Sequence, residues 1–428
     1  METIGAYLER KQEELRLLNE CLRNRLDLAC PSSVDDIVRS KFQITAALRA
    51  EQELHDWKAT ETAWSHTADR VSGPFAFSYD YQRADLTVRG PSFYEFDCGC
   101  TITAIYTASG MAAISAVLLA SAHIVEKADI LVLPGSYGET LELIRGFVPH
   151  LRLVALKLPL VDALASGNSP RILLLDSCSF AGAFEAVLRS DGSGLDLLVF
   201  DTTCFAGRSG RIRRVLKWAQ RYGIPLVLVR SHNKLDSLGA EYGRLGSAVF
   251  VHGNGARQRA GRPDWSGLAS ETRNAVRLLG GAALPAHFPP FVGSAAYLAL
   301  TKRRVAAILR NSRRMARYLA PKLPAQSTEL HFTHGLYVTL RGKRPLDEAG
   351  ARQAAEEMSN ELRAKGFPIR HAGSFGFDFA ATEWFHDATT DQYSVRVTVP
   401  DLPTELWDDL TASVARWWLA HHWAGGEA

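Results

Sequence analysis

One lysine follows an apolar stretch that is typical of a buried β-strand. Residues 224–229 (IPLVLV) are apolar and rich in β-branched side chains, and the polar turn SHNK follows at residues 231–234. Open α/β sheets bind ligands at the carboxyl ends of their strands. Lys234 could form a Schiff base there, provided that its surroundings favour the neutral amine. The alternative is an exposed loop lysine, and the spacing S-x-x-K does not by itself decide between the two.

Pyridoxal 5′-phosphate (PLP) is a cofactor that binds to a lysine in this way, and it needs four further groups. These are an anion site, a carboxylate for the pyridinium nitrogen, a flat group over the ring and a cation for the substrate carboxylate. The anion site is predicted within residues 107–113 (TASGMAA), where Ser109, Gly110 and Met111 open a helix after a strand. Backbone N–H groups and the helix dipole attract anions at such a start. A tightly packed turn of small residues is the alternative.

Two candidates for the cofactor ring follow other predicted strands. Asp201 comes directly after the apolar residues 197–200, where it could hold the pyridinium proton, and Thr203 is placed to contact the same ligand. Tyr137 is flanked by glycines that give its ring access to a planar cofactor. An aspartate that only caps a turn and a tyrosine that only packs are the alternatives.

Arg396 is the candidate for the substrate carboxylate. It lies within the β-branched stretch VRVTV at residues 395–399, where an unpaired buried guanidinium would be costly. The planar guanidinium matches a carboxylate with two parallel hydrogen bonds. An outward-facing position on an alternating strand is the alternative.

Composition limits the class of protein. A chain of 428 residues with 46% hydrophobic and 22% charged residues is typical of a soluble globular protein of about two to three domains. The net charge of +3 gives no nucleic-acid footprint, and the arginines of residues 301–317 are expected on a solvated helix face. The apolar residues 103–125 contain too many polar side chains for a membrane span. No nucleic-acid or membrane partner is therefore expected.

The cysteines are expected to be reduced thiols in the cytoplasm. The first residues, METIGAYLERKQEEL, contain acidic side chains and no apolar core of a secretory signal. Six scattered cysteines in such a chain favour a reducing compartment. Cys98 and Cys100 have no second pair at zinc spacing, so no metal site is expected.

The chain is expected to form three regions: residues 1–100, 101–295 and 296–428. The first should be a helical arm, broken at Pro31, and an ordered loop over residues 72–100. The last should be a connecting helix and a smaller α+β domain. In between, apolar stretches without alternation are separated by helical ones, which predicts a mostly parallel sheet covered by helices. The predicted strands are residues 103–106, 130–133, 153–156, 172–175, 197–200, 226–229 and 248–251, and the helices are residues 111–127, 140–147 and 211–222.

These pieces, in this order, resemble the fold-type-I PLP enzymes and, more narrowly, the cystathionine γ-synthase/γ-lyase family of sulfur amino-acid metabolism. The resemblance runs from about residue 81 to the C-terminus. The family's motifs S-G-M-A-A-I, L-Y-G-G-T, D-N-T-F, S-x-x-K and R-[LIV]-S-[VT]-G are matched by SGMAAI at residues 109–114, SYGET at 136–140, DTTCF at 201–205, SHNK at 231–234 and RVTVP at 396–400. The family's Y-x-R, which reaches the phosphate of a neighbouring subunit, is matched by Tyr81 and Arg83.

The resemblance implies a fold-type-I fold and a role for each matched residue. Lys234 would hold PLP and move the substrate's Cα proton, Asp201 would keep the pyridine protonated, and Tyr137 would stack on the ring. Ser109, Gly110, Met111 and Ser231 would hold the phosphate, and Arg396 would bind the substrate carboxylate. The family also implies a homodimer or homotetramer with active sites at the subunit interface. The reaction would be elimination or replacement at Cβ or Cγ of an L-amino acid.

Three departures leave the reaction open. The family's E-S-P-x-N-P turn, whose Asn faces the cofactor's ring hydroxyl, stands here as DSCSF at residues 176–180. Its H-S-D-V segment is replaced by GAEYGRLG at 239–246, closer to aminotransferases, in which an arginine such as Arg244 binds the phosphate. The N-terminal arm is also longer than expected. An aminotransferase, a specialised biosynthetic substrate and a non-catalytic binding module therefore remain alternatives.

Overall fold

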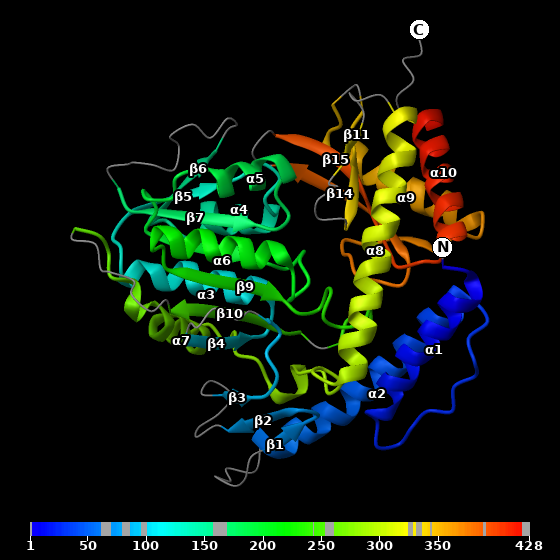
Figure 1. The fold of residues 1–428 in the computed structure, drawn as a ribbon, viewed down its shortest axis with the longest axis horizontal. Helices are drawn as coiled ribbons and strands as arrows, with labels where there is room; N and C mark the ends of the chain where they lie inside the picture. Colours follow the sequence, from blue (N-terminus) through cyan, green and yellow to red (C-terminus); the bar gives the residue numbers. More distant parts are fainter. Residues whose placement is uncertain are drawn as a thin grey trace. The chain divides into compact units, whose positions relative to one another are not determined.

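The chain forms two compact units, each assembled from separate segments (Figure 1). The computed structural model describes residues 2–60, 70–78, 86–95, 101–156, 169–242, 244–252, 261–323, 328–330, 336–342, 345–387 and 391–421. The large unit contains residues 52–233 and 242–293, and the small unit contains residues 1–51, 234–241 and 294–428. These boundaries differ from the three regions expected above, because the helical arm and the segment that begins at Lys234 group with the C-terminal residues.

A seven-stranded sheet forms the centre of the large unit. Its order is β4 (Thr101–Thr107), β10 (Gly246–His252), β9 (Leu226–Ser231), β8 (Leu197–Asp201), β7 (Arg171–Asp176), β5 (Ala128–Val132) and β6 (Leu151–Ala155). Only β10 runs against its neighbours, β4 and β9, among these strands. Each predicted apolar stretch overlaps one strand, so the prediction of a mostly parallel α/β sheet is confirmed.

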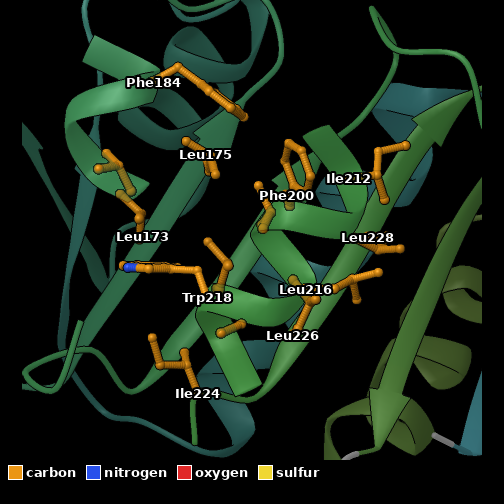
Figure 2. Close-up of a cluster of buried hydrophobic side chains, with 14 of the residues drawn as sticks. Leu173, Leu175, Phe184, Phe200, Ile212, Leu216, Trp218, Ile224, Leu226 and Leu228 are labelled. Atoms are coloured by element: carbon orange, nitrogen blue, oxygen red, sulfur yellow. The ribbon is translucent and has the colours of Figure 1, made fainter. Parts of the chain in front are cut away.

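Burial of alternate strand residues fixes the central strands against two helices. Side chains that alternate along β7, β8 and β9 point to the same face, where α5 (Ala181–Arg189) and α6 (Gly210–Tyr222) pack on them. Figure 2 shows this cluster, which includes Leu173, Leu175, Phe184, Phe200, Ile212, Leu216, Leu226 and Leu228. In α6 the buried residues recur with helical spacing, and Gly223 ends the helix in the left-handed conformation at φ 61°.

The remaining helices of the large unit are α3 (Gly110–Ala120), α4 (Gly138–Phe147) and α7 (Leu268–Leu278). A second, antiparallel sheet consists of β1 (Arg70–Ser72), β2 (Phe75–Ser78) and β3 (Thr87–Arg89). The expected ordered loop over residues 72–100 therefore contains two strands, β2 and β3. Phe75 and Phe77 alternate along β2, and both rings lie 5.0 Å from the ring of Phe288. This short alternation was the available signal for a strand.

The small unit is an α+β arrangement. Its helices are α1 (Ile4–Glu20), α2 (Val34–Thr60, which extends beyond the unit's boundary), α8 (Ala295–Lys322), α9 (Glu348–Ala364) and α10 (Thr404–His421). Its sheet has the order β11 (Thr328–Leu330), β12 (Tyr337–Leu340), β15 (Gln392–Thr398), β14 (Ala380–Asp387) and β13 (Ile369–His371). The predicted smaller C-terminal α+β domain is thus present. Among the described residues, no helix combines the length and apolarity needed to cross a membrane.

Seven charged side chains meet in the interior of the small unit. They are Arg10, Lys11 and Glu14 of α1, Lys41 of α2, Arg304 of α8, and Asp378 and Asp401, and we call them the ion cluster. Each is at most 6% exposed. The prediction that the α8 arginines lie on a solvated face was wrong for Arg304, which is 1% exposed, because it finds buried carboxylates.

The two aspartates of the ion cluster, Asp378 and Asp401, are held ionised by neighbouring cations, which lower the pKa of each. Burial by itself would raise the pKa of Asp378, but the charges of Arg304, Lys11 and Lys41 hold it well below its usual range. A carboxylate with a lowered pKa stabilises the folded state above the unfolded-state pKa of about 4. That contribution is lost as the pH falls through the folded-state pKa.

We expect Asp378→Ala to lower the free energy of unfolding at pH 7 by about 3–5 kcal/mol, because buried cations lose their partner. The difference from the wild type should shrink as the pH falls below about 4, because the carboxyl of the unfolded wild-type chain is then protonated while the folded one is still ionised. Urea unfolding followed by tryptophan fluorescence measures both effects. The matched control is Arg303→Ala, which removes an exposed pair with Glu13 between the same two helices, α8 and α1, and should cost less than about 1 kcal/mol. Equal losses in the two variants would contradict this account.

Candidate active site

The junction between β4 and α3 has the features of an anion site. Ser109 is the N-cap of α3, and its side chain accepts a hydrogen bond from the Ala112 amide at 3.0 Å. The amides of the first helical turn have no carbonyl within the helix to bind, so they can serve an anion together with the helix dipole. The predicted residues Ser109, Gly110 and Met111 therefore stand at the start of a helix, as expected.

Two glycines allow the segments at this junction to approach closely. A Cβ on Gly110 would lie 2.8 Å from Cβ of Ser231, and one on Gly246 would lie 2.1 Å from the carbonyl oxygen of Ser109. Only glycine permits these approaches, so the sequence brings Ser109, Gly110 and Ser231 together at adjacent segments. The resulting set of hydroxyls and backbone amides suits a phosphate group.

A row of hydrogen bonds connects this junction to Asp201. The Ser231 amide donates to Oγ1 of Thr203 at 3.1 Å, and the Thr203 amide donates to Oδ1 of Asp201 at 2.8 Å. The row exists because β8 and β9 are parallel neighbours, so their carboxyl ends meet at one edge of the sheet. An anion site and a buried carboxylate are thereby held in one arrangement within the large unit.

Tyr137 lies at the start of α4, close to the end of β7. Its amide donates to Oδ2 of Asp176 at 2.7 Å, and its side chain is 38% exposed. Gly135 precedes it with φ 77°, and a Cβ there would lie 2.5 Å from the ring of Phe180. In the first turn of α4, the hydroxyl of Thr140 points toward the sulfur of Met111 at 3.8 Å. The predicted ring-stacking tyrosine is thus held beside the start of α3.

Two buried carboxyls lie side by side at the strand ends. Asp176 and Asp201 are paired in register across β7 and β8. Burial raises the pKa of Asp176 well above its usual value, and Cys178 and Asp201 raise it further. Burial also raises the pKa of Asp201, although hydrogen bonds from Thr203 and the charge of Arg230 oppose the shift. Such a site favours a cation beside the carboxylates.

Arg230 was missed in the sequence. Its side chain is 1% exposed, and its Nη1 donates to the carbonyls of Thr202 at 2.8 Å and Phe205 at 2.6 Å. It therefore fixes the turn that follows Asp201. The available signal was a charged residue at the end of an otherwise apolar strand, where a guanidinium must be satisfied by hydrogen bonds.

Lys234 belongs to the small unit and is partly exposed. Its Nζ donates to the hydroxyl of Ser374 and lies 5.6 Å from the centroid of the Phe375 ring. Lys234 follows Ser231 by three residues, so the covalent chain limits the distance between their Cα atoms to about 11 Å. Ser374 and Phe375 carried no sequence pattern that would have identified them.

Arg396 is buried in the small unit rather than exposed on its strand. Its side chain is 2% exposed, and its guanidinium lies over the rings of Tyr337 and Phe385, 4.4 Å and 3.1 Å from their centroids. Across the sheet it stands opposite Thr339 of β12 and Glu383 of β14. Burial excludes the outward-facing alternative, while the binding of a substrate carboxylate stays a prediction.

The other predicted positions are less informative. Arg244 is described and exposed. Tyr81 and Arg83 lie outside the described residues, as do Cys98 and Cys100. No group of three or more His, Cys, Asp or Glu side chains in the described part of the chain could hold a metal ion.

We expect Gly246→Ala to disrupt the anion site, because its Cβ would meet a backbone oxygen that no side-chain rotation can move. The free energy of unfolding should fall by about 1–3 kcal/mol, and the affinity for inorganic phosphate should drop by about tenfold or more. Calorimetric titration with inorganic phosphate measures the affinity. The control is Gly146→Ala in α4, where a Cβ meets nothing within 4 Å and should stabilise the helix by about 0.5–1 kcal/mol. The same phosphate affinity in both variants would exclude this location for the site.

We expect Asp201→Asn to gain stability relative to the wild type as the pH rises from 4 to 8. The raised pKa means that the folded state favours the protonated carboxyl, so the wild type loses stability above the unfolded-state pKa of about 4. Asparagine is neutral throughout this pH range, and it also removes the negative charge that raises the pKa of Asp176. Thermal unfolding at the two pH values measures the change.

For Asp129→Asn, the stability relative to the wild type is expected to fall rather than rise as the pH increases. Its hydrogen bond with Arg152 lowers the pKa of Asp129, so this variant should lose stability relative to the wild type as the pH rises from about 2 to 4 and change little from 4 to 8. If the two variants respond to pH with the same sign, the electrostatic account of Asp201 is wrong.

Comparison with known proteins places the fold. No protein-family model and no curated protein matches the sequence. Among solved structures, cystathionine gamma synthase from Xanthomonas oryzae pv. oryzae in complex with cystathionine is 18% identical with a TM-score of 0.50, over 74% of this chain and 82% of that one. The metB protein from Corynebacterium glutamicum is 16% identical with a TM-score of 0.52, over 76% and 82% of the two chains.

A third similar structure contains N′-pyridoxyl-lysine-5′-monophosphate. It is a putative O-acetylhomoserine (thiol)-lyase from Campylobacter jejuni subsp. jejuni, 15% identical with a TM-score of 0.50, over 73% of this chain and 81% of that one. The central, mostly parallel sheet and the smaller C-terminal sheet are thus shared with proteins of low sequence identity. The chain has the fold-type-I fold of PLP-dependent enzymes.

Proposed function

We propose that the protein is a PLP-dependent lyase or transferase that eliminates or replaces a group at Cβ or Cγ of an L-amino acid. The observation that carries the proposal is the row of contacts from Ser109 and Gly110 through Ser231 and Thr203 to Asp201. It joins an anion site to a buried carboxylate, the two groups that PLP requires at opposite ends of its ring. The chain reaches Lys234 three residues after Ser231.

The residues present fit this cofactor. Ser109, Gly110, Met111 and Ser231 would hold the phosphate, because glycine at position 110 lets the start of α3 approach Ser231 closely. Asp201 and Thr203 would meet the ring, and Tyr137 would lie against it. Lys234 would be the covalent attachment point, and Tyr81 and Arg83 would come from a partner subunit. When bound, PLP supplies an electron sink that stabilises negative charge at the substrate's Cα.

Each side chain has a defined task in this proposal. Asp201 holds a proton on the pyridine nitrogen, and its burial makes that pairing with a cation favourable. The amine of Lys234 would act as the base that takes the proton from the substrate's Cα. Arg396 binds the substrate carboxylate through its planar guanidinium. Tyr137 covers one side of the ring, and its hydroxyl can carry a proton.

Elimination or replacement is favoured over transamination by the names of the similar structures. They include a cystathionine gamma synthase bound to cystathionine and a putative O-acetylhomoserine (thiol)-lyase. The aminotransferase alternative rests on Arg244 as a phosphate ligand, and this side chain is exposed, whereas the N-cap and free amides at the start of α3 support a phosphate site there. A homodimer or homotetramer in the cytoplasm belongs to the same proposal, supported by the match of Tyr81 and Arg83 to a motif that crosses between subunits.

The first test detects covalent attachment of PLP to Lys234. Purified protein is incubated with PLP, treated with sodium borohydride and digested, and mass spectrometry should find a pyridoxyl group on Lys234. Lys234→Ala should abolish this labelling, whereas Lys302→Ala on α8 should retain it. Absence of the adduct on Lys234 in the wild type would overturn the proposal.

The second test identifies the reaction class. The protein is incubated with L-amino acids that carry a leaving group at Cβ or Cγ, without any added keto acid. Release of ammonia and a 2-oxoacid, lost in Lys234→Ala, is the expected result for elimination. Strict dependence on a keto-acid acceptor would make the protein an aminotransferase. Cofactor binding without turnover of any tested substrate would favour a binding module.

A further inference from the structure

The segment that begins at Lys234 has an unusual backbone. Within residues 234–241, Leu238 and Glu241 have φ angles of 53° and 45°. The left-handed region is unfavourable for side chains with a Cβ, and such residues persist only where their surroundings hold them. The contacts around this segment therefore need an explanation beyond ordinary loop structure.

Three side chains from helices hold the carbonyls of this segment. Nζ of Lys41 donates to the carbonyl of Leu238 at 2.5 Å, and Oγ1 of Thr45 donates to that of Ala240 at 3.2 Å. Both donors belong to α2 of the N-terminal arm. From α8, the hydroxyl of Tyr297 donates to the carbonyl of Asp236 at 2.9 Å.

A second segment, residues 373–378, lies against the lysine itself. Ser374 accepts the hydrogen bond from Nζ of Lys234. Gly376 has φ 93°, and a Cβ on it would lie 2.7 Å from the carbonyl oxygen of Lys234. The carbonyl of Gly376 accepts a hydrogen bond from Nη2 of Arg304 at 2.7 Å. The same guanidinium also contacts the first segment, because a Cβ on Gly239 would lie 2.5 Å from it.

The ion cluster ties these donors together. Nζ of Lys41 lies 2.5 Å from Oε2 of Glu14 and 2.8 Å from Oδ2 of Asp378. Arg304 pairs with the other oxygen of Asp378 and lies 3.7 Å from Glu14. The two cations that bind backbone carbonyls near Lys234 are thus fixed by the same two carboxylates, one of them from α1. Charge-assisted hydrogen bonds of this kind are stronger and more directional than neutral ones.

Stability alone does not account for the arrangement. Well-packed apolar side chains often stabilise an interior as much as buried ion pairs do. Apolar side chains could not donate to the carbonyls of Leu238 and Gly376. The charges therefore serve the geometry of the two segments.

We propose that the N-terminal helical arm is a positioning device for Lys234. The ion cluster and Thr45 fix residues 234–241, Arg304 fixes residues 373–378, and together these segments set the place and hydrogen bond of the lysine amine. The inference relies on the proposed function only for what that amine does. The positioning itself concerns contacts of this chain and exists without a cofactor.

The test uses one hydroxyl, because removing a buried charge could unfold the unit. Thr45→Val deletes the donor to Ala240 with little change in volume, and Thr45→Ser restores it. In cofactor-free protein, hydrogen–deuterium exchange of peptides that cover residues 234–241 should become about tenfold faster in Thr45→Val. Thr45→Ser should stay within about twofold of the wild type, as should the exposed control Arg303→Ala. Tyr297→Phe, which deletes the donor to Asp236, should act in the same direction as Thr45→Val.

A second readout is the rate at which borohydride fixes PLP on Lys234, measured from pH 6 to 9. Thr45→Val should change this pH profile, and Thr45→Ser should restore it. Equal exchange in Thr45→Val and Thr45→Ser would overturn the inference, as would faster exchange spread evenly over the small unit. If neither the wild type nor any variant is labelled on Lys234, the proposed function fails. The exchange measurements still decide whether the arm positions the segment.

Discussion

Parallel pairing of β7, β8 and β9 is the constraint on which the candidate site of the large unit depends. It brings the ends of the three strands to one edge, so Asp176, Asp201 and Ser231 follow buried apolar stretches at the same level. The helices α5 and α6, which pack on the cluster in Figure 2, fix these strands and thereby also fix the polar residues at the strand ends. Burial also sets the chemistry, because it raises the pKa of both aspartates and prepares the edge for a cation.

The small unit uses buried charge in a different way. In the ion cluster, cations outweigh burial and hold the pKa of Asp378 below its usual range, whereas at the sheet edge burial dominates and raises the pKa of Asp201. The difference lies in the partners: several cations pair with Asp378, while Asp201 has hydrogen bonds from Thr203 and the charge of Arg230. A fully paired carboxylate is structural, and an incompletely neutralised one is available to a ligand.

The sequence predicted what depends on short-range pattern. Apolar stretches located the seven strands, and the residues just after them located Asp201, Ser231 and the start of α3. It did not predict the ion cluster, because Lys11 and Asp401 are 390 residues apart in the sequence and no local pattern joins them. Arg304 looked like one more arginine on a solvated helix. Charges are usually exposed, so only the tertiary partners could reveal that this one is buried.

Two departures from the family resemblance, the long arm and the altered segment after the lysine, are one structural feature. At and just before the start of the altered segment, the carbonyls of Ala240 and Leu238 accept hydrogen bonds from Thr45 and Lys41 of α2 in the arm. Residues in the left-handed region persist only where their surroundings hold them, and these hydrogen bonds do so for Leu238. The buried charges of the arm fix the Lys41 donor. In the large unit, a hydrogen bond between residues distant in sequence likewise holds the start of α4, because Oδ2 of Asp176 accepts from the Tyr137 amide. Hydrogen bonds from residues distant in the sequence thus hold both the segment that begins at Lys234 and the one that carries Tyr137.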